Sequence, residues 1–214
     1  MDVFRMLDTL RPTVTGLDQV PAWFLWLGTP VFAKPLAHLF HQSLATGTVP
    51  CQWKIASITL IPKKAKPQHP SDFRPISITL VMLRSLERFV IRNFIYSALS
   101  QLYPSLDFSD QFAFQPSGST TAAIMAMLHT VRSMLNDNDY VHVFSFDFSK
   151  AFNTVRHVSL MSKLAQLTLP DSIYNWAVDF FDSHAHCTRF AGITSEVAAI
   201  HLSLIHIWRC RRRG

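Results

Sequence analysis

The most informative stretch of this sequence is Val141-His-Val-Phe-Ser-Phe-Asp-Phe-Ser-Lys-Ala-Phe-Asn-Thr-Val-Arg-His157. Its first half is rich in β-branched and aromatic residues, which favour an extended chain. Alternate side chains of a strand point to opposite faces, so Phe144, Phe146 and Phe148 would share one face and Asp147 would lie on the other. The stretch predicts a buried strand that delivers Asp147 to its end, then a turn and a short helix. A carboxylate there needs a partner, such as a cation.

Composition limits the class of protein. The 214 residues are 49% hydrophobic, enough to bury the core of one or two domains. No run of 18 apolar residues occurs, which predicts no membrane span, and the N-terminus lacks the order of a secretory signal. The three cysteines are widely spaced, which is typical of a reducing compartment. We expect an intracellular protein, nuclear or cytoplasmic, that is not secreted; its oligomeric state is left open.

The net charge of +6 comes mainly from the C-terminal tail. Residues 201–214 hold four arginines and no acid, so the rest of the chain has 20 − 4 = 16 basic against 14 acidic residues. Global charge therefore does not establish nucleic-acid binding. The tail also differs abruptly in composition from the preceding chain and resembles translated sequencing-adaptor sequence, which predicts a non-native tail. A basic nucleic-acid or localisation tail is the alternative.

Periodicity predicts an α/β (α+β) chain. Helices are expected at 31–46, 80–102, 120–135 and 160–167 and again from Asp171, with Gly47 ending the first of them. The helix at 120–135 should bury one face, formed by Ile124, Met127, Leu128 and Val131. Extended segments at 53–62 and 71–78 flank a loop with Lys63, Lys64 and Lys66, which predicts a hairpin carrying positive charge. Another strand pair is expected at 189–199.

Four ordered segments resemble the reverse transcriptase domain of non-long-terminal-repeat (LINE-type) retrotransposons. They are Trp53-Lys54 with Ile61-Pro-Lys63, Asp72-Phe-Arg-Pro-Ile-Ser77, Asp110-Gln-Phe-Ala-Phe-Gln-Pro-Ser-Gly-Ser-Thr-Thr121 and Phe146-Asp-Phe-Ser-Lys-Ala-Phe-Asn-Thr-Val-Arg-His157. The similarity extends over about residues 10–200. It implies a right-hand polymerase, an RNA-directed DNA polymerase, of which this chain supplies a helical lead-in (1–50), the fingers (51–135) and a partial palm (136–200), incomplete at the C-terminus.

The resemblance also implies roles for single residues. Asp147 would be a catalytic carboxylate that binds the two Mg²⁺ ions of nucleotidyl transfer, together with an Asp-Asp pair further along the family's chain. Lys63 and Arg74 would contact the incoming triphosphate. Phe152 would be the aromatic gate against a ribose 2′-hydroxyl, and Gln115 would lie near the template. The implied partners are an RNA template, a DNA primer and a dNTP, with no membrane.

The chain departs from the family pattern in several places. Asn153 stands where the family usually has Asp, and Gln115 stands where it usually has Arg, which removes a cation near the template. No (Tyr/Phe)-Ala-Asp-Asp and no Gln-Gly-Ser follow the Trp176 region. One carboxylate of three is present, so we expect this chain alone to be inactive as a polymerase.

Simpler interpretations remain beside these. Asp147 alone would be a turn-capping residue, Phe152 a core residue, and Lys63 and Arg74 solvated charges. His184, His186 and Cys187 suggest zinc, but a structural site needs four ligands and no partner pair is evident. Two rival hypotheses are a non-catalytic nucleic-acid-binding module with the finger surface, and a fragment that does not fold stably because its sheet keeps an exposed edge.

Overall fold

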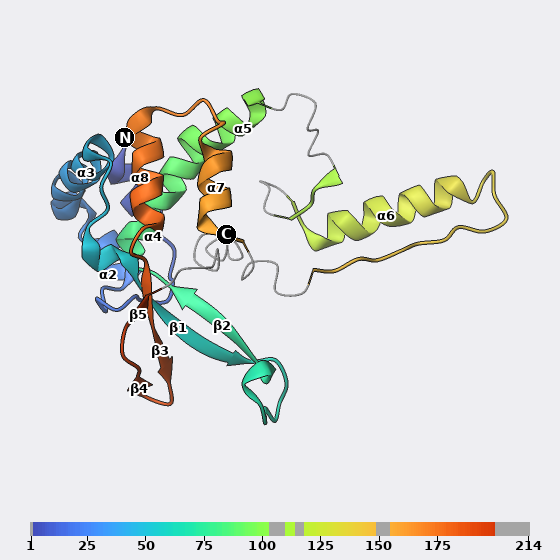
Figure 1. The fold of residues 1–214 in the computed structure, drawn as a ribbon, viewed down its shortest axis with the longest axis horizontal. Coiled ribbons are helices and arrows are strands. Elements are labelled where there is room, and N and C mark those ends of the chain that lie inside the picture. Colours follow the sequence, from blue (N-terminus) through green and yellow to red (C-terminus); the bar gives the residue numbers. More distant parts are fainter. Residues whose placement is uncertain (1, 103–109, 114–117, 149–154, 200–214) are drawn as a thin grey trace.

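The computed structural model describes residues 2–102, 110–113, 118–148 and 155–199. Within these residues the chain combines α-helices with one mixed β-sheet (Figure 1), so the α/β class predicted from the sequence is confirmed. None of the described helices is long and apolar enough to cross a membrane. The described α-helices are α1 (Val3–Asp8), α2 (Ala22–Leu27), α3 (Thr29–Thr46), α4 (Val81–Val90), α5 (Tyr96–Leu102), α6 (Thr120–Met134), α7 (His157–Leu164) and α8 (Asp171–Phe181).

Helix α3 ends where its sequence predicts. Gly47 follows its last residue with a φ of 64°, and the Gly47 N–H bonds to the Ser43 carbonyl. Glycine adopts this left-handed conformation without the steric cost that a Cβ would bring, so it closes the helix. The long helix predicted at 80–102 is present as α4 and α5, joined without a break by a π-helical turn, η3 (Ile91–Ile95).

The β-sheet is built around β1 (Ile55–Pro62), which follows the 3₁₀ turn η1 (Cys51–Lys54). β2 (Phe73–Ile78) pairs with β1 antiparallel, with Leu60 opposite Pro75, and this confirms the predicted hairpin. β3 (Ala185–Phe190) lies on the other side of β1 and is parallel to it, with Ser57 opposite Cys187. The short strands β4 (Ile193–Thr194) and β5 (Ala198–Ala199) each pair antiparallel with β3.

The apolar core joins segments from both ends of the described chain. Phe40 of α3 is fully buried, as are Leu83 and Leu86 of α4, while Trp176 of α8 is almost so. They form one cluster with buried residues of α1 and α2. The N-terminal helices therefore share a single core with α4 and α8. Throughout, we call this packed part, with the sheet and α7, the body.

Polar contacts also attach α4 to the N-terminal part of the chain. Arg84 is buried, and its guanidinium donates to Thr13 Oγ1 at 2.9 Å and to the Val14 carbonyl at 2.6 Å. The loop before α2 is thereby fixed to α4. Burial raises the pKa of the nearby Glu87 to about 8, although Arg84 and Arg88 partly offset the effect. Glu87 is therefore a neutral acid at pH 7.

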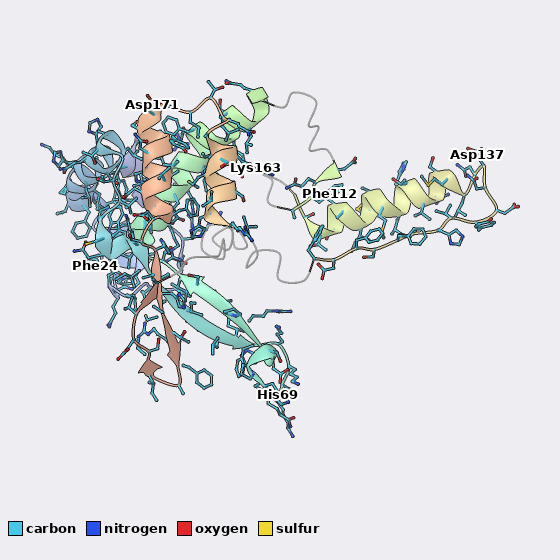
Figure 2. All side chains as sticks on the ribbon, viewed as in Figure 1. Phe24, His69, Phe112, Asp137, Lys163 and Asp171 are labelled. Atoms are coloured by element: carbon cyan, nitrogen blue, oxygen red, sulfur yellow. The ribbon has the colours of Figure 1, made fainter. Side chains whose placement is uncertain are left out.

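Helix α6 and the segment that follows it stand apart from the body. Figure 1 shows α6 extending away from the remaining helices, and the chain returning past Asp137 in an extended form; Figure 2 labels Asp137 at the far end. We call residues 118–148 the arm. Ser119 caps α6 by accepting a hydrogen bond from the Ala122 N–H at 3.1 Å.

Two predictions made for the arm are wrong. α6 has no buried residue, and its expected core side chains Ile124, Met127 and Leu128 are 49%, 48% and 58% exposed. Residues 141–148 belong to no strand of the described sheet. The physical reason is the same in both cases: a periodic apolar face, or a β-forming segment, needs a second surface to cover it, and the described residues provide none there.

Candidate functional site

The tip of the β1–β2 hairpin carries the positive charge that the sequence predicts. Lys63 directly follows β1; its backbone N–H donates to the Asp72 carbonyl at 2.7 Å, and its Nζ donates to the Ser71 carbonyl at 2.7 Å. Lys64 and Lys66 lie in the same loop, and all three lysines are exposed. Figure 2 labels His69 at the end of this projection. The hairpin thus holds several cations away from the body, where a large anion can reach them.

One carboxylate organises this basic tip. Asp72 Oδ2 lies 2.9 Å from Lys64 Nζ and accepts hydrogen bonds from the Gln68 N–H at 2.8 Å and the His69 N–H at 3.0 Å. Lys64, followed by these two backbone donors, holds the pKa of the Asp72 carboxyl below its usual range. Asp72 thus pairs with Lys64 and closes the loop, and the nearby charge of Lys63 lowers the pKa of its carboxyl further.

Arg74 lies on β2, opposite Ile61 of β1, with an exposed side chain. None of the ion pairs among the described residues involves Arg74, Lys63 or Lys66. The structure therefore brings Lys63 and Arg74 onto one hairpin, within two residue pairs of each other along the ladder. Cations on a rigid ribbon are suited to phosphate oxygens, and a planar guanidinium can bind two of them at once.

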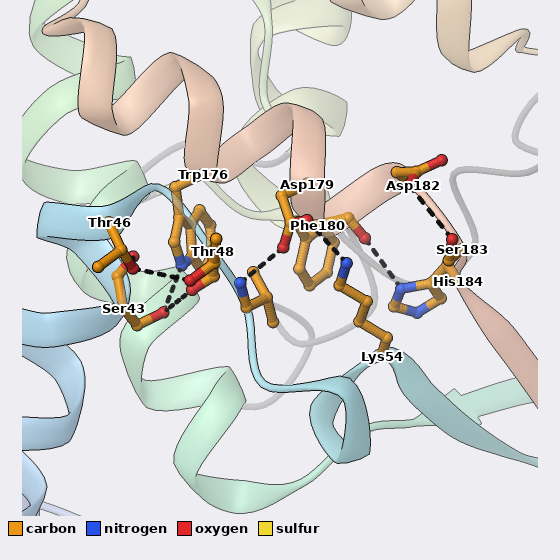
Figure 3. A network of polar contacts seen from close by, with 11 residues as sticks. Ser43, Thr46, Thr48, Lys54, Trp176, Asp179, Phe180, Asp182, Ser183 and His184 are labelled. Carbon is orange, nitrogen blue, oxygen red and sulfur yellow. Dashed lines mark hydrogen bonds and ion pairs between the residues drawn. The ribbon is translucent and has the colours of Figure 1, made fainter.

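The base of the hairpin is fixed to α8 by a polar network (Figure 3). Asp179 accepts a hydrogen bond from the Val49 N–H at 2.6 Å and pairs with Lys54 Nζ at 3.0 Å, immediately before β1 begins. Trp176 Nε1 donates to Ser43 Oγ at 3.0 Å, and Ser43 Oγ donates to the Thr48 carbonyl at 2.5 Å. The turn between α3 and β1 is thus held to α8, which sets where the hairpin leaves the body.

A buried histidine lies beside this network. His184 precedes β3, and its Nδ1 lies 3.1 Å from the Phe180 carbonyl. Burial lowers the pKa of His184 to about 4; the hydrogen bond with Phe180 opposes this, while His157, Lys54 and His186 add to it. His184 is neutral at pH 7. Among the described residues, no three histidine, cysteine or acidic side chains gather as a metal would need, so nothing there supports the zinc interpretation.

The carboxylate predicted as catalytic is not part of such a cluster. Asp147 is exposed in the returning segment of the arm and makes no hydrogen bond or ion pair with any residue that the structure describes. Two other predicted site residues, Gln115 and Phe152, lie outside the described residues. None of the described hydrogen bonds and ion pairs joins Asp147 to Lys63 or Arg74, so the described contacts do not connect these three residues into one site.

Sequence reasoning did not assign the two carboxylates that shape the hairpin. Asp72 had a signal, because it is the only acid within a run of cations from Lys63 to Arg74. No local sequence signal pointed to Asp179, because its partners Val49 and Lys54 lie about 130 residues earlier in the chain. Each of these carboxylates pairs with a lysine, Asp72 with Lys64 and Asp179 with Lys54.

The chain is similar to known polymerases. The family described as "Reverse transcriptase (RNA-dependent DNA polymerase)" matches residues 61–198, which is more than half of the chain. Among the relatives, a probable RNA-directed DNA polymerase from transposon BS of Drosophila melanogaster is 29% identical over 62% of this chain and 14% of its own length.

Other relatives are also proteins of mobile elements. A retrovirus-related Pol polyprotein from the type-1 retrotransposable element R2 of Popillia japonica is 29% identical, over 62% of this chain and 18% of its own length. The RNA-directed DNA polymerase from the mobile element jockey of Drosophila melanogaster is 24% identical, over 77% of this chain and 18% of its own length. The chain thus spans less than a fifth of the length of each of these three relatives.

Proposed function

The chain belongs to the reverse transcriptase (RNA-dependent DNA polymerase) family of non-long-terminal-repeat retrotransposons, and on that premise we propose that it is a part of an enzyme that copies RNA into DNA. The observation that carries the proposal is the family match over residues 61–198. The match includes the basic hairpin strand β2 and Asp147. The RNA template, DNA primer, dNTP and intracellular setting belong to the proposal.

In this proposal, residues 51–135 are the fingers and residues 136–200 a partial palm. The exposed cations of the β1–β2 hairpin support the finger assignment, since Lys63 and Arg74 lie on one ribbon and Asp72 folds its tip. Lys63 and Arg74 contact the triphosphate of the incoming nucleotide, whose charge they neutralise. Gln115 lies beside the template, and Phe152 contacts the sugar.

The proposed Mg²⁺ site needs more ligands than the described residues supply. Two-metal nucleotidyl transfer requires several carboxylates around ions about 4 Å apart. Asp147 is the one metal ligand that the proposal names in this chain. The described residues hold no cluster of three metal-ligating side chains. The residues present do not fit a complete two-ion site, so no catalytic step is assigned to this chain and we expect it to be inactive by itself.

Primer extension tests this expectation. The 214-residue chain is incubated with an RNA template, an annealed DNA primer, dNTPs and Mg²⁺, beside Asp147→Asn. We expect no extension by either protein, because one carboxylate cannot hold both ions. Extension by the wild-type chain that Asp147→Asn abolishes would contradict the proposed inactivity and would show that Asp147 acts in this chain.

A second candidate function is non-catalytic binding of nucleic acid by the hairpin. It is favoured by one observation: the cations of the tip are exposed and held on a folded ribbon, while Asp147 has no partner carboxylates among the described residues. Electrostatic binding of this kind weakens as salt rises, because each neutralised phosphate releases a counterion.

Binding to a labelled single-stranded RNA, measured at several salt concentrations, tests the hairpin surface. One variant replaces Lys63, Lys64, Lys66 and Arg74 by Gln, and a control variant removes the same charge at the exposed residues Arg5, Lys34, Arg132 and Lys163. We expect the hairpin variant to lose about three units of the logarithmic salt slope, against a smaller loss for the control. Equal losses would contradict a hairpin site, and a loss only on deleting residues 201–214 would assign binding to the tail.

A further inference from the structure

Arg189 is brought to the hairpin by the pairing of β3 with β1 (Figure 1). In that parallel ladder Arg189 lies opposite Thr59. In the antiparallel ladder on the other side of β1, Arg74 lies opposite Ile61. Arg74 and Arg189 are far apart in the sequence, and no local pattern joins them. The sheet nevertheless places one arginine on each side of the same stretch of β1.

The two arginines share one face of the sheet. Register partners point to the same face in both kinds of ladder, and so do residues two positions apart on one strand. Because Thr59 and Ile61 are two positions apart, Arg189 and Arg74 lie on their common face. From the spacing of strands and the rise per residue, the two arginine Cα atoms are about 12 Å apart. Two extended arginine side chains can span this distance.

An aromatic contact on the opposite face links the two outer strands. Phe73 precedes Arg74 on β2, and Phe190 follows Arg189 on β3, so both rings belong to the face away from the arginines. Their centroids are 5.7 Å apart, in an edge-to-face arrangement. This contact crosses β1 and holds β2 and β3 together at the level of the two arginines. The backbones that carry Arg74 and Arg189 are therefore fixed relative to each other.

The strands carry only positive formal charge here. None of the five described strands contains Asp or Glu, and Arg74 and Arg189 are the only Arg or Lys residues on them. Arg189 is exposed, and neither of the ion pairs among the described residues involves it. Lys63 follows β1 directly. An anion bound over Thr59 and Ile61 would meet cations from both sides and from the end of the strand.

We propose that Arg189 is a third cation of the triphosphate site and binds the same phosphate chain as Lys63 and Arg74. This inference rests on the proposed function, in which Lys63 and Arg74 contact the incoming nucleotide. A triphosphate offers oxygens along a chain rather than at one point, and a guanidinium can bind two of them at once. Arg74 and Arg189 bind this chain from the two sides of β1, and Lys63 binds it from the end of that strand.

Isothermal titration calorimetry of the full chain with inorganic tripolyphosphate tests the assignment. We expect one ligand per chain, and we expect Arg189→Gln to weaken binding about tenfold, as Arg74→Gln should, because each removes a charge-assisted contact. Arg189→Lys keeps the charge but not the planar fork, so it should lose less affinity. The titrations are run at low ionic strength, which limits the screening of exposed charges.

Two controls separate a site from the overall charge of the chain. Arg92→Gln removes an exposed arginine of η3 and should bind like the wild type. The exchange variant Thr188→Arg, Arg189→Thr keeps the net charge but moves the guanidinium to the opposite face of β3, because neighbouring residues of a strand alternate. We expect it to bind as weakly as Arg189→Gln. Circular dichroism and urea unfolding verify that each variant is folded.

The possible results separate this inference from the proposed function. Weakening by Arg74→Gln but not by Arg189→Gln would exclude Arg189 and leave the proposed roles of Lys63 and Arg74 intact. Weakening by neither variant, or no binding by the wild type, would exclude the whole triphosphate site.

Three further results would overturn the role of Arg189 in other ways. Equal weakening by Arg92→Gln, or full binding by the exchange variant, would mean that only the overall charge matters. Two ligands per chain, each lost with one arginine, would mean that Arg74 and Arg189 bind separately. Weaker binding of single-stranded RNA by Arg189→Gln, with tripolyphosphate binding unchanged, would assign Arg189 to the RNA backbone instead.

Discussion

The body and the arm of this molecule carry similar apolar sequence patterns but differ in whether those side chains are buried. In α8 of the body, Ile173, Trp176 and Phe180 recur at helical spacing and all three are buried. In α6 of the arm, Ile124, Met127 and Leu128 recur at similar spacing and all three are about half exposed. The difference is the presence of a facing surface. Amphipathic periodicity shows which side of a helix can be buried, and packing determines whether it is.

The largest expected effect comes from comparing two substitutions by alanine, one of a buried ring in the body and one of an exposed ring in the arm. Phe40→Ala removes a fully buried ring of α3 that packs edge-to-face against Trp53, and we expect it to lower the free energy of unfolding by about 3–5 kcal/mol. Phe146→Ala removes an equally large ring from the arm that is 90% exposed, and we expect a change within about 0.5 kcal/mol.

Urea unfolding measures both values. A large loss for Phe146→Ala would mean that the arm packs against another part of the chain. No cooperative transition in the wild type would instead support a chain that does not fold stably alone.

The second test concerns the polar anchor at the base of the hairpin, which has no counterpart among the described contacts of the arm. Asp179→Ala removes the acceptor of the Val49 N–H and leaves Lys54, which is mostly buried, without its partner. We expect a loss of about 1–3 kcal/mol in the free energy of unfolding. Asp182→Ala is the control, since Asp182 is exposed just beyond α8 and, among the described residues, its carboxylate accepts a hydrogen bond only from the neighbouring Ser183. Similar losses in the two variants would argue against the anchor.

The smallest expected effect on the free energy of unfolding comes from Glu87, the buried acid of α4. The folded-state pKa of Glu87 is raised to about 8, from 4.5 in the unfolded chain, so the folded state keeps a proton that the unfolded state has released. This stabilising contribution is fully present below pH 4.5 and is lost as pH rises through 8. Between pH 6.5 and 8 the free energy of unfolding should fall by about 1 to 2 kcal/mol in the wild type.

Glu87→Gln should abolish this decline. The pH window avoids His184, whose pKa is lowered to about 4 from 6.5, so that its stabilising contribution is present above pH 6.5 and is lost as pH falls toward 4. Urea unfolding at pH 6.5, 7.25 and 8 gives the slopes. An equal decline in the variant would show that another group causes it.

Much of the body could be predicted from local signals. Gly47 ends α3 as expected, and the run of cations between two β-forming segments correctly indicated the hairpin. The parallel pairing of β1 with β3 could not be predicted, because Ser57 and Cys187 meet through a register that no local pattern encodes. The role of Asp179 was hidden for the same reason.

The arm was mispredicted because its local signals depend on a partner. Residues 141–148 have the composition of a strand, but hydrogen bonds to a neighbour are what make an extended chain a strand, and none are described there. The roles of Asp147, Lys63 and Arg74 stay predictions, as do those of Gln115 and Phe152, which lie outside the described residues.

The contact of Asp179 with Val49 has a consequence for how the chain folds. These residues are 130 positions apart, and the arm lies within the loop that they close. Closing a long loop costs entropy before the contacts that compensate for it can form, which slows folding. During synthesis, the N-terminal helices and β1 must wait for α8 and β3 to leave the ribosome. The arm emerges before α8, so nascent chains expose its aromatic residues while the body is still incomplete.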